Sequence, residues 1–471
     1  TLSGSSIPLP ARNYSGGSMA DGDNIIRLAE LQDSGKDINT TEDAMALVFA
    51  ERHAGHLRYV AVWSRWLSYD GTCWRYDDTL HVFERARVIC REVAAACVRP
   101  AGAIMSAKTV AAVEKLARSD RRLAARAAQW DASPGLFNAA DATVDLYTGD
   151  GRAPDPIDYM TKRAACAVAA RGVAHPMWTA FLNRVTDGNV ELQQFLQRYI
   201  GYCCTGSTTE HAFVFAYGTG ANGKGTFLNT VAGVFGDYAT VADMSTFLAS
   251  NQERHPTELA KLAGARLVVA QETQKGRRWD ETKIKALTGG DKITARFMRQ
   301  DFFDFTPMFK LFIAGNHKPR LSSVDEAMRR RLLLVPFTVQ IPVAERDPDL
   351  PRKLQAEWPA ILRWAVDGCL EWQQTGLAPP QIVRDATDSY FADQDHLQQW
   401  LDDCTQDAGP FAFTRIRDLF SSWRTWCEDR NLKSGSASAL SEALADRGFV
   451  KKREASPTSS QRPANAGCDR Q

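Results

Sequence analysis

The sequence predicts an α/β fold whose sheet carries polar residues where its strands end. Three short apolar runs, at 213–217, 266–270 and 309–314, have the length and residue types of buried parallel strands. The first run leads into a glycine-rich loop and then into an apolar segment that can form a helix. This succession of strand, loop and helix is the one that a phosphate-binding site needs.

The glycine-rich loop has the spacing G-x-x-x-x-G-K. Glycines let backbone N–H groups turn inward around an anion, the following helix adds a favourable dipole, and the lysine supplies a positive charge for the β and γ phosphates. We therefore predict that the loop binds a nucleotide; a plain glycine turn is the alternative. The predicted nucleotide-binding residues are Gly218, Gly220, Ala221, Asn222, Gly223, Lys224, Gly225 and Thr226.

Two positions depart from the usual pattern of such a site. The residue after the lysine, normally a Ser or Thr that holds Mg²⁺, is Gly225, so the nearest hydroxyl belongs to Thr226. After the second strand, Gln271 precedes Glu272 where two acids are common. We predict Glu272 as the general base and, together with Thr226, as a metal ligand. The alternative is an exposed loop glutamate.

Polar residues near the third strand extend the predicted catalytic set. Asn316 follows that strand, where a neutral side chain can sense the γ-phosphate or position water; alone, it is more typical of a turn. Arg330 and Arg331 precede an apolar run at 332–337. Such arginines stabilise charge on a transferring phosphoryl group and often come from a neighbouring subunit. A surface helix that ends in basic residues is the alternative.

The segment before the third strand predicts a β-hairpin. Residues 293–298 can pair with 302–305, which leaves Arg299 and Gln300 at the tip. Inside a ring of subunits, a basic tip could hold the backbone of one DNA strand through phosphate contacts. By itself, the pattern predicts only a hairpin with an exposed arginine.

Composition and charge are those of an ordinary globular protein. The formal net charge is +1, so any nucleic-acid binding depends on local basic patches. None of the ten cysteines forms a C-x-x-C pair or a cysteine–histidine cluster with zinc spacing, which favours buried, reduced thiols in a cytosolic protein. No apolar run reaches about 18 residues, so we expect no transmembrane helix and no membrane partner.

The flanking regions are predicted to form further domains. Thr41 can cap a helix at 42–53, and the aromatic stretch at 57–78 predicts a hairpin with buried tryptophans; stacking on single-stranded bases is the alternative. Residues 80–129 have helical spacing with a basic run. Residues 413–453 predict helix, turn, helix, in a winged-helix-like or small packing module.

Five ordered stretches make the chain resemble a known family. They are GTGANGKGTFLN, RLVVAQET, KALTGGDKITARFM, KLFIAGNHKP and DEAMRRRLLLVPFTVQIP. They look like the successive motifs of superfamily 3 helicases, in particular the phage and plasmid primase-helicase group related to the poxvirus primase-helicase. RYVAVWSRWLSYDGTCWRYDD resembles that group's amino-terminal helicase-associated domain, and PPQIVRDATDSYFADQDHLQQWLDDC its post-ATPase connector.

This resemblance implies an AAA+-like P-loop ATPase, ATP and Mg²⁺ as cofactors, hexameric rings and 3′-to-5′ movement along DNA. It assigns phosphate binding to Lys224 and its loop, the acid to Glu272, the sensor to Asn316 and the in-trans arginine to Arg330 or Arg331. The DNA contacts that it implies are Lys285, Lys292, Arg296 and Arg299. The region before residue 176 has neither a zinc ribbon nor an obvious acidic metal triad, so no priming activity is predicted.

The predicted domains follow from these assignments. They are a flexible leader at 1–40, a mixed α+β helicase-associated collar at 41–175, the ATPase at 176–392, a helical or winged-helix-like domain at 393–453 and a disordered tail at 454–471. We predict an ATP-dependent helicase that replicates a phage, prophage or plasmid-like element in the cytoplasm of a bacterial host. It would act on single-stranded or forked DNA as a homo-oligomer, beside a separate primase or other replication protein. The alternatives are a ring-forming, NTP-dependent initiator or scaffold with little unwinding and, more weakly, a monomeric P-loop kinase.

Overall fold

The computed structural model describes residues 39–97, 102–250, 257–271, 276–298, 301–321, 324–406 and 412–452. It divides into two compact units, Thr1–Tyr390 and Phe391–Gln471, and the division falls inside helix α13 (Gln381–Gln394). Most of the predicted leader and all of the predicted tail lie outside the described residues.

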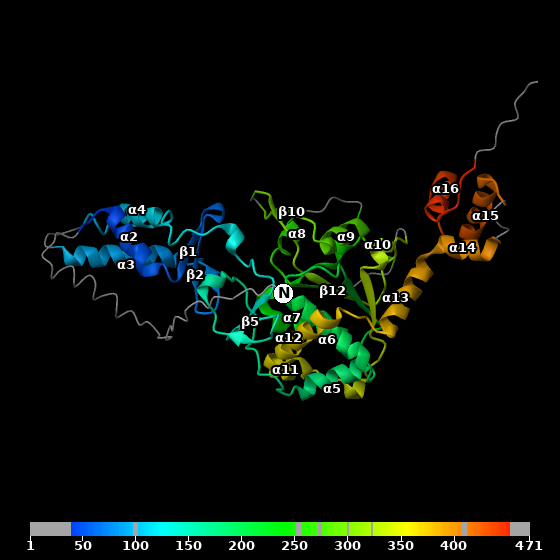
Figure 1. Ribbon diagram of the computed structural model, residues 1–471, viewed down its shortest axis with the longest axis horizontal. Helices are drawn as coiled ribbons and strands as arrows, with labels where there is room; N and C mark the ends of the chain where they lie inside the picture. The colour runs from blue at the N-terminus through cyan, green and yellow to red at the C-terminus, as the bar shows by residue number, and fades with distance from the viewer. Residues whose placement is uncertain are drawn as a thin grey trace, which may run out of the picture. The chain divides into compact units, whose positions relative to one another are not determined.

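A five-stranded parallel sheet forms the core of the first unit (Figure 1). Every neighbouring pair of strands is parallel, so all the carboxyl ends lie along one edge and all the amino ends along the other. The three strands predicted from the apolar runs lie side by side in this sheet. The strand order is β13 (Leu332–Pro336), β7 (Phe213–Tyr217), β12 (Lys310–Gly315), β9 (Leu267–Gln271) and β8 (Ala239–Val241).

Both faces of the sheet are covered, which explains why its strands are apolar at consecutive positions. On β7, Val214 and Ala216 belong to the core cluster shared with the helices of one face. Phe213 and Phe215 instead contact Trp279, with ring centroids 5.7 and 5.6 Å apart. The helices whose residues join the first cluster are α5 (Pro176–Val185), α6 (Val190–Cys204), α7 (Lys224–Phe235), α11 (Leu350–Gln355), α12 (Trp358–Thr375) and, through Val383, the start of α13.

The amino-terminal region combines helices with a small antiparallel sheet. Helix α2 (Glu42–His53) begins where the sequence predicts because the Thr41 hydroxyl accepts a hydrogen bond from the Ala44 N–H at 3.3 Å. Trp66 and Trp74 are buried as predicted, but Trp63 is only half-buried because it ends a 3₁₀ turn between two strands. The other elements are β1 (Leu57–Val60), β2 (Arg65–Tyr69), β3 (Trp74–Tyr76), α3 (His81–Ala96) and α4 (Ala107–Ala117).

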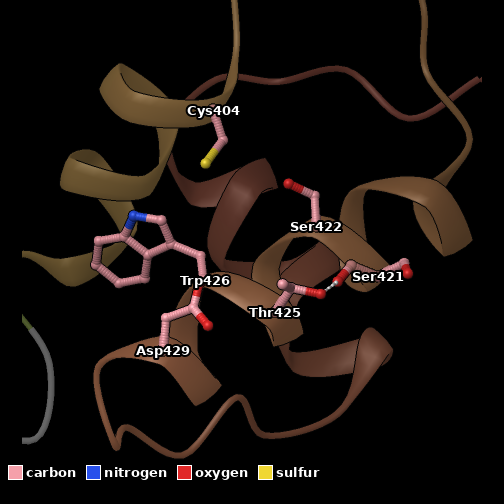
Figure 2. A pocket seen from close by; sticks show the side chains of 6 residues that line it. All are labelled: Cys404, Ser421, Ser422, Thr425, Trp426 and Asp429. Atoms are coloured by element: carbon pink, nitrogen blue, oxygen red, sulfur yellow. Dashed lines mark hydrogen bonds between the residues drawn. The ribbon is translucent and has the colours of Figure 1, made fainter.

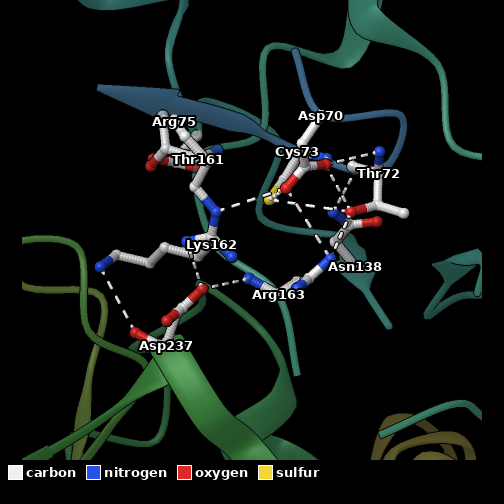
Figure 3. Close-up of polar contacts among 10 residues, drawn as sticks. Asp70, Thr72, Cys73, Arg75, Asn138, Thr161, Lys162, Arg163 and Asp237 are labelled. Atoms are coloured by element: carbon white, nitrogen blue, oxygen red, sulfur yellow. Dashed lines mark hydrogen bonds and ion pairs between the residues drawn. The ribbon is translucent and has the colours of Figure 1, made fainter. Parts of the chain in front are cut away.

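Polar contacts join this region to the far end of α7 (Figure 3). Arg75 forms an ion pair with Asp237 at 2.8 Å, two residues beyond the end of the helix. The Arg163 N–H donates to the same carboxylate at 3.3 Å, and Asn138 donates to the Thr72 carbonyl at 2.8 Å. Asn138 ends the first strand of the sheet β4 (Leu136–Asn138), β5 (Thr143–Asp145) and β6 (Gly151–Arg152). The helix that starts at the glycine-rich loop is therefore anchored at its other end.

The predicted hairpin forms before β12. Strands β10 (Ile293–Ala295) and β11 (Phe303–Phe305) pair in antiparallel fashion over three residues each, which is shorter than predicted. Its predicted tip residues, Arg299 and Gln300, lie outside the described residues. The remaining helices of the first unit are α8 (Thr257–Ala260), α9 (Glu281–Gly289) and α10 (Glu326–Arg329).

The second unit is helical in its described part. Helices α14 (His396–Cys404), α15 (Ile416–Asp429) and α16 (Ala437–Asp446) pack around Trp400 and Trp426. The Ser436 side chain caps α16 by accepting from the Ala439 N–H at 3.2 Å. Residues 391–406 and 412–452 contain no strand, so the wing of the predicted winged helix stays a prediction.

The cysteines of the described residues are free thiols. Burial raises the pKa of Cys166 and of Cys203 to about 12, so both stay protonated and unreactive near neutral pH. The described ranges contain no group of three or more Cys, His, Asp or Glu side chains arranged to hold a metal. Across the same ranges, no helix has the length and apolarity that crossing a bilayer requires.

Candidate functional site

The loop from Gly218 to Gly223 turns the chain from β7 into α7. Gly223 caps the helix with a φ of 81°, a conformation that glycine adopts without strain. The Asn222 amide donates to the Phe337 carbonyl, just beyond β13, at 2.7 Å. A Cβ on Gly218 would lie 2.0 Å from that same carbonyl oxygen, so no side chain fits there. The shape of the loop is therefore fixed by contact with the segment that follows β13.

Lys224, the first residue of α7, is buried and turned back over the loop. Its Nζ donates to the Gly218 carbonyl at 2.7 Å and to Asn222 Oδ1 at 3.0 Å. Burial lowers the pKa of this ammonium below its ordinary value. Among the described residues, Lys224 has no carboxylate partner, so its positive charge is held by neutral oxygens. Such a cation is suited to a bound phosphate.

Asn316 reaches the same lysine from a different strand. Strand β12 ends at Gly315, which pairs in register with Tyr217, the last residue of β7. Asn316 is exposed at this edge, and its Oδ1 lies 3.4 Å from Nζ of Lys224. The structure thus brings the predicted phosphate lysine and the predicted sensor together.

The predicted metal position lies between the first turn of α7 and the end of β9. Thr226 is half-buried in that turn. Gln271, the last residue of β9, donates from Nε2 to Asn229 Oδ1 on α7 at 3.0 Å. Hydroxyl and amide oxygens are hard donors of the kind that Mg²⁺ accepts, so the residues present fit this ion. Glu272, the predicted base and metal ligand, lies outside the described residues.

Arg330 and Arg331 lie at the opposite edge of the sheet. The Arg331 carbonyl accepts a hydrogen bond at 2.7 Å from the N–H of Phe213, the first residue of β7, whereas the glycine-rich loop follows the last residue of that strand. Strand geometry puts about 13 Å between the two ends of β7. Arg330 is exposed, and Arg331 donates to the Ala327 carbonyl at 2.9 Å. One chain therefore does not bring these arginines to Lys224.

Lys285 belongs to the same edge as the arginines. Its Nζ lies 2.5 Å from Oδ2 of Asp325, whose other oxygen caps α10 by accepting from the Met328 N–H at 2.7 Å. Burial acts to raise the Asp325 pKa, but the hydrogen bonds from Lys285 and from the backbone outweigh it and lower that pKa. In a single chain, Lys285 thus fixes the start of the helix that leads to the arginines.

The predicted DNA-contact residues of the hairpin are exposed to different degrees. Lys292 is exposed directly before β10. Arg296 is half-buried, and its guanidinium carbon lies 4.8 Å from the ring centroid of Phe302, which is itself 59% exposed. Arg299 lies outside the described residues. The hairpin therefore presents a cation and an aromatic ring together at its outer end.

Sequence reasoning missed two contributors to the edge of the sheet where the loop lies. Nζ of Lys318 is 4.0 Å from the ring centroid of Tyr217, at the carboxyl end of β7. The Ile341 N–H donates to the Ala221 carbonyl at 2.9 Å, so the segment after β13 forms one wall of the loop. The only signal for Lys318 was its place two residues after Asn316.

Two surface hollows contain none of the motif residues. One, of about 300 Å³, lies between α14 and α15 (Figure 2), and its lining is Cys404, Ser421, Ser422, Thr425, Trp426 and Asp429. The other, of about 630 Å³, lies between α5 and α12 and includes His175 and Asp367. Burial raises the pKa of Asp367, and the residues that line this second hollow include none of the glycine-rich loop.

Two family models match parts of the chain. Residues 46–187 match the family described as "D5 N terminal like", and residues 216–331 match one described as "Family of unknown function (DUF5906)". The first match covers residues 46–175 of the region assigned above to a helicase-associated domain and continues to residue 187. The second covers the glycine-rich loop, Asn316 and both arginines.

Viral proteins are similar to much of the chain. This chain is 25% identical over 317 residues to "Putative helicase L207/L206" of Acanthamoeba polyphaga mimivirus. That alignment covers 62% of this chain and 33% of the relative. The chain is also 26% identical over 258 residues to "Putative helicase 022R" of Frog virus 3 (isolate Goorha), an alignment that covers 50% of this chain and 26% of the relative. The chain thus spans a third or less of the length of these relatives. Together with the family matches, these relatives confirm the resemblance to the phage and plasmid primase-helicase group related to the poxvirus primase-helicase.

A solved structure shares the fold. The apo structure of the NrS-1 C terminal region has a TM-score of 0.50 at 9% identity, over 85% of this chain and 85% of that one. At this identity, the likeness concerns the fold alone.

Proposed function

We propose that this chain is the motor part of an ATP-dependent DNA helicase. The observation that carries the proposal is the buried Lys224 ammonium, whose contacts among the described residues are all with neutral oxygens, one of them that of Asn316 after the neighbouring strand. A phosphate chain bound there would meet the lysine, the N-terminus of α7 and the backbone N–H groups of the loop. Magnesium would supply charge neutralisation for the phosphates, with Thr226 and Glu272 as proposed ligands.

The proposal includes a ring of identical subunits, six in number, that moves 3′ to 5′ along single-stranded or forked DNA. Support for an assembly comes from the two edges of the sheet. Arg330 is exposed at the amino edge, where it can approach the loop of a neighbouring copy but not its own. Phosphoryl transfer would then be complete only between subunits. Lys292 and Arg296 are the proposed DNA contacts among the described hairpin residues.

A second candidate function rests on the metal position. Gly225 offers no hydroxyl, and Gln271 offers an amide in place of a carboxylate, so hydrolysis can be slow. A ring that binds NTP and DNA, recruits a primase or another replication protein and unwinds little is consistent with these two residues. A forked duplex separates the two functions, since a scaffold binds the fork and leaves it paired.

The test compares Lys224→Ala with Lys261→Ala, which removes an exposed lysine elsewhere in the same unit. DNA-stimulated ATP hydrolysis and fork unwinding should both be lost in the first variant and retained in the second. Thermal unfolding of the two variants provides the control for folding. Hydrolysis and unwinding at wild-type rates by a folded Lys224→Ala protein would refute the site.

A further inference from the structure

The first turn of α7 has an open position that faces β9. A Cβ placed on Gly225 meets, among the described residues, only Oε1 of Gln271, at an ordinary contact distance of 3.8 Å. At Gly223, two residues earlier, a Cβ would lie 2.4 Å from the Val185 side chain. Space for a side chain is therefore present at residue 225, and the group that borders it is an amide oxygen.

The orientation of Gln271 follows from its second contact. Nε2 donates to Asn229 Oδ1, which is one turn further along α7, at 3.0 Å. An amide that donates its N–H₂ group toward Asn229 has its oxygen available on the other side. That oxygen is the atom nearest to the Gly225 position. With Nε2 on Asn229, the oxygen end of the Gln271 amide faces the start of the helix.

We propose that Oε1 of Gln271 is a ligand of the divalent cation that accompanies the bound nucleotide, and that Asn229 positions it. This inference rests on the proposed nucleotide binding. The amide oxygen would occupy the space that a hydroxyl at residue 225 would otherwise use. A neutral carbonyl oxygen is a suitable donor for Mg²⁺ or Mn²⁺, but it neutralises no charge. The site therefore binds its cation more weakly than one with a carboxylate at this position.

The experiment measures Mn²⁺ binding to the protein–ADP complex by electron paramagnetic resonance. Gln271→Ala should lower the Mn²⁺ affinity by roughly ten- to a hundredfold, and Asn229→Ala by about tenfold through loss of orientation. Gln271→Glu should raise it, since the carboxylate adds a charge. ADP binding in EDTA should be unchanged in Gln271→Ala and Asn229→Ala, because no cation takes part and neither change adds a charge.

A rescue experiment tests whether a side chain at residue 225 can bind the cation where the Gln271 amide oxygen is proposed to bind it. Adding Gly225→Ser to Gln271→Ala should restore most of the Mn²⁺ affinity, since the serine hydroxyl enters the vacated space. Unchanged Mn²⁺ affinity in both Gln271→Ala and Gln271→Glu, with ADP binding intact, would overturn the ligand assignment and leave the proposed function standing. Failure of the wild-type protein to bind ADP at all would instead refute the proposed function.

Discussion

Replacing Gly218 by alanine should disrupt the glycine-rich loop, whereas the same change at Gly220 meets no described atom of the protein. A Cβ on Gly218 would lie 2.0 Å from the Phe337 carbonyl oxygen and 2.4 Å from Nδ2 of Asn222, whereas one on Gly220 would meet no heavy atom within 4 Å. Ordinary contact begins near 3.4 Å, so the carbonyl would have to retreat by about 1.4 Å. Overpacking of this kind costs about 1–3 kcal/mol.

That cost can appear in either of two measurements. If the loop keeps its shape, the unfolding free energy of Gly218→Ala falls by about 1–3 kcal/mol; if the loop moves, ADP affinity falls by about 5- to 150-fold. Urea unfolding and calorimetric titration with ADP, run on both variants, distinguish the two routes. The reasoning is refuted if Gly218→Ala keeps wild-type values in both assays, or if Gly220→Ala loses as much unfolding free energy as Gly218→Ala does.

Three further predictions concern assembly, pH and DNA. Lys224→Ala and Arg330→Ala should each lack ATPase activity. An equal mixture of the two should recover up to about a quarter of the wild-type activity, because about a quarter of the interfaces then pair an intact loop with an intact arginine. No recovery would contradict an arginine supplied by the neighbouring subunit. Burial lowers the pKa of Lys310 to about 7. In the unfolded chain, the Lys310 ammonium keeps its proton up to about pH 10.5. The free energy of unfolding of the wild-type protein should therefore rise from about pH 7 to about pH 10.5 relative to that of Lys310→Met, and parallel pH profiles of the two proteins would contradict the lowered pKa. Lys292→Ala with Arg296→Ala should reduce the slope of log K against log salt for single-stranded DNA by about 1.4, with ADP affinity unchanged; an unchanged slope would remove both residues from the DNA contact.

The parts of the fold that local chemistry determines are predicted to the residue. The strand at 213–217 and the helix at 42–53 have the predicted ends, because a buried apolar run and a threonine cap act within a few residues. The half-exposed Trp63 is the counterexample. A 3₁₀ turn at Ala61–Trp63 rotates it out of the alternation that the sequence shows, and Ser64 follows with a positive φ.

The candidate site was predictable where its residues follow strands directly. Asn316 reaches Lys224 because parallel strands in register end at the same edge. The wall beyond β13 and the ring contact of Lys318 depend on packing between distant segments, which no local pattern encodes. The ion pair of Lys285 with Asp325 is of the same kind, since 40 residues separate the partners.

The placement of positive charge decides whether one chain can complete the reaction. Lys224 lies at the carboxyl edge of the sheet, and Arg330 lies at the amino edge, so the length of β7 keeps them apart in a single copy. Lys318 is another cation at the carboxyl edge, where its ammonium lies over the Tyr217 ring. If mixed variants recover activity, the second charge comes from a neighbour and the active form is an assembly. If they recover none, Lys318 becomes the nearer candidate for that charge, and the ring is no longer needed for hydrolysis.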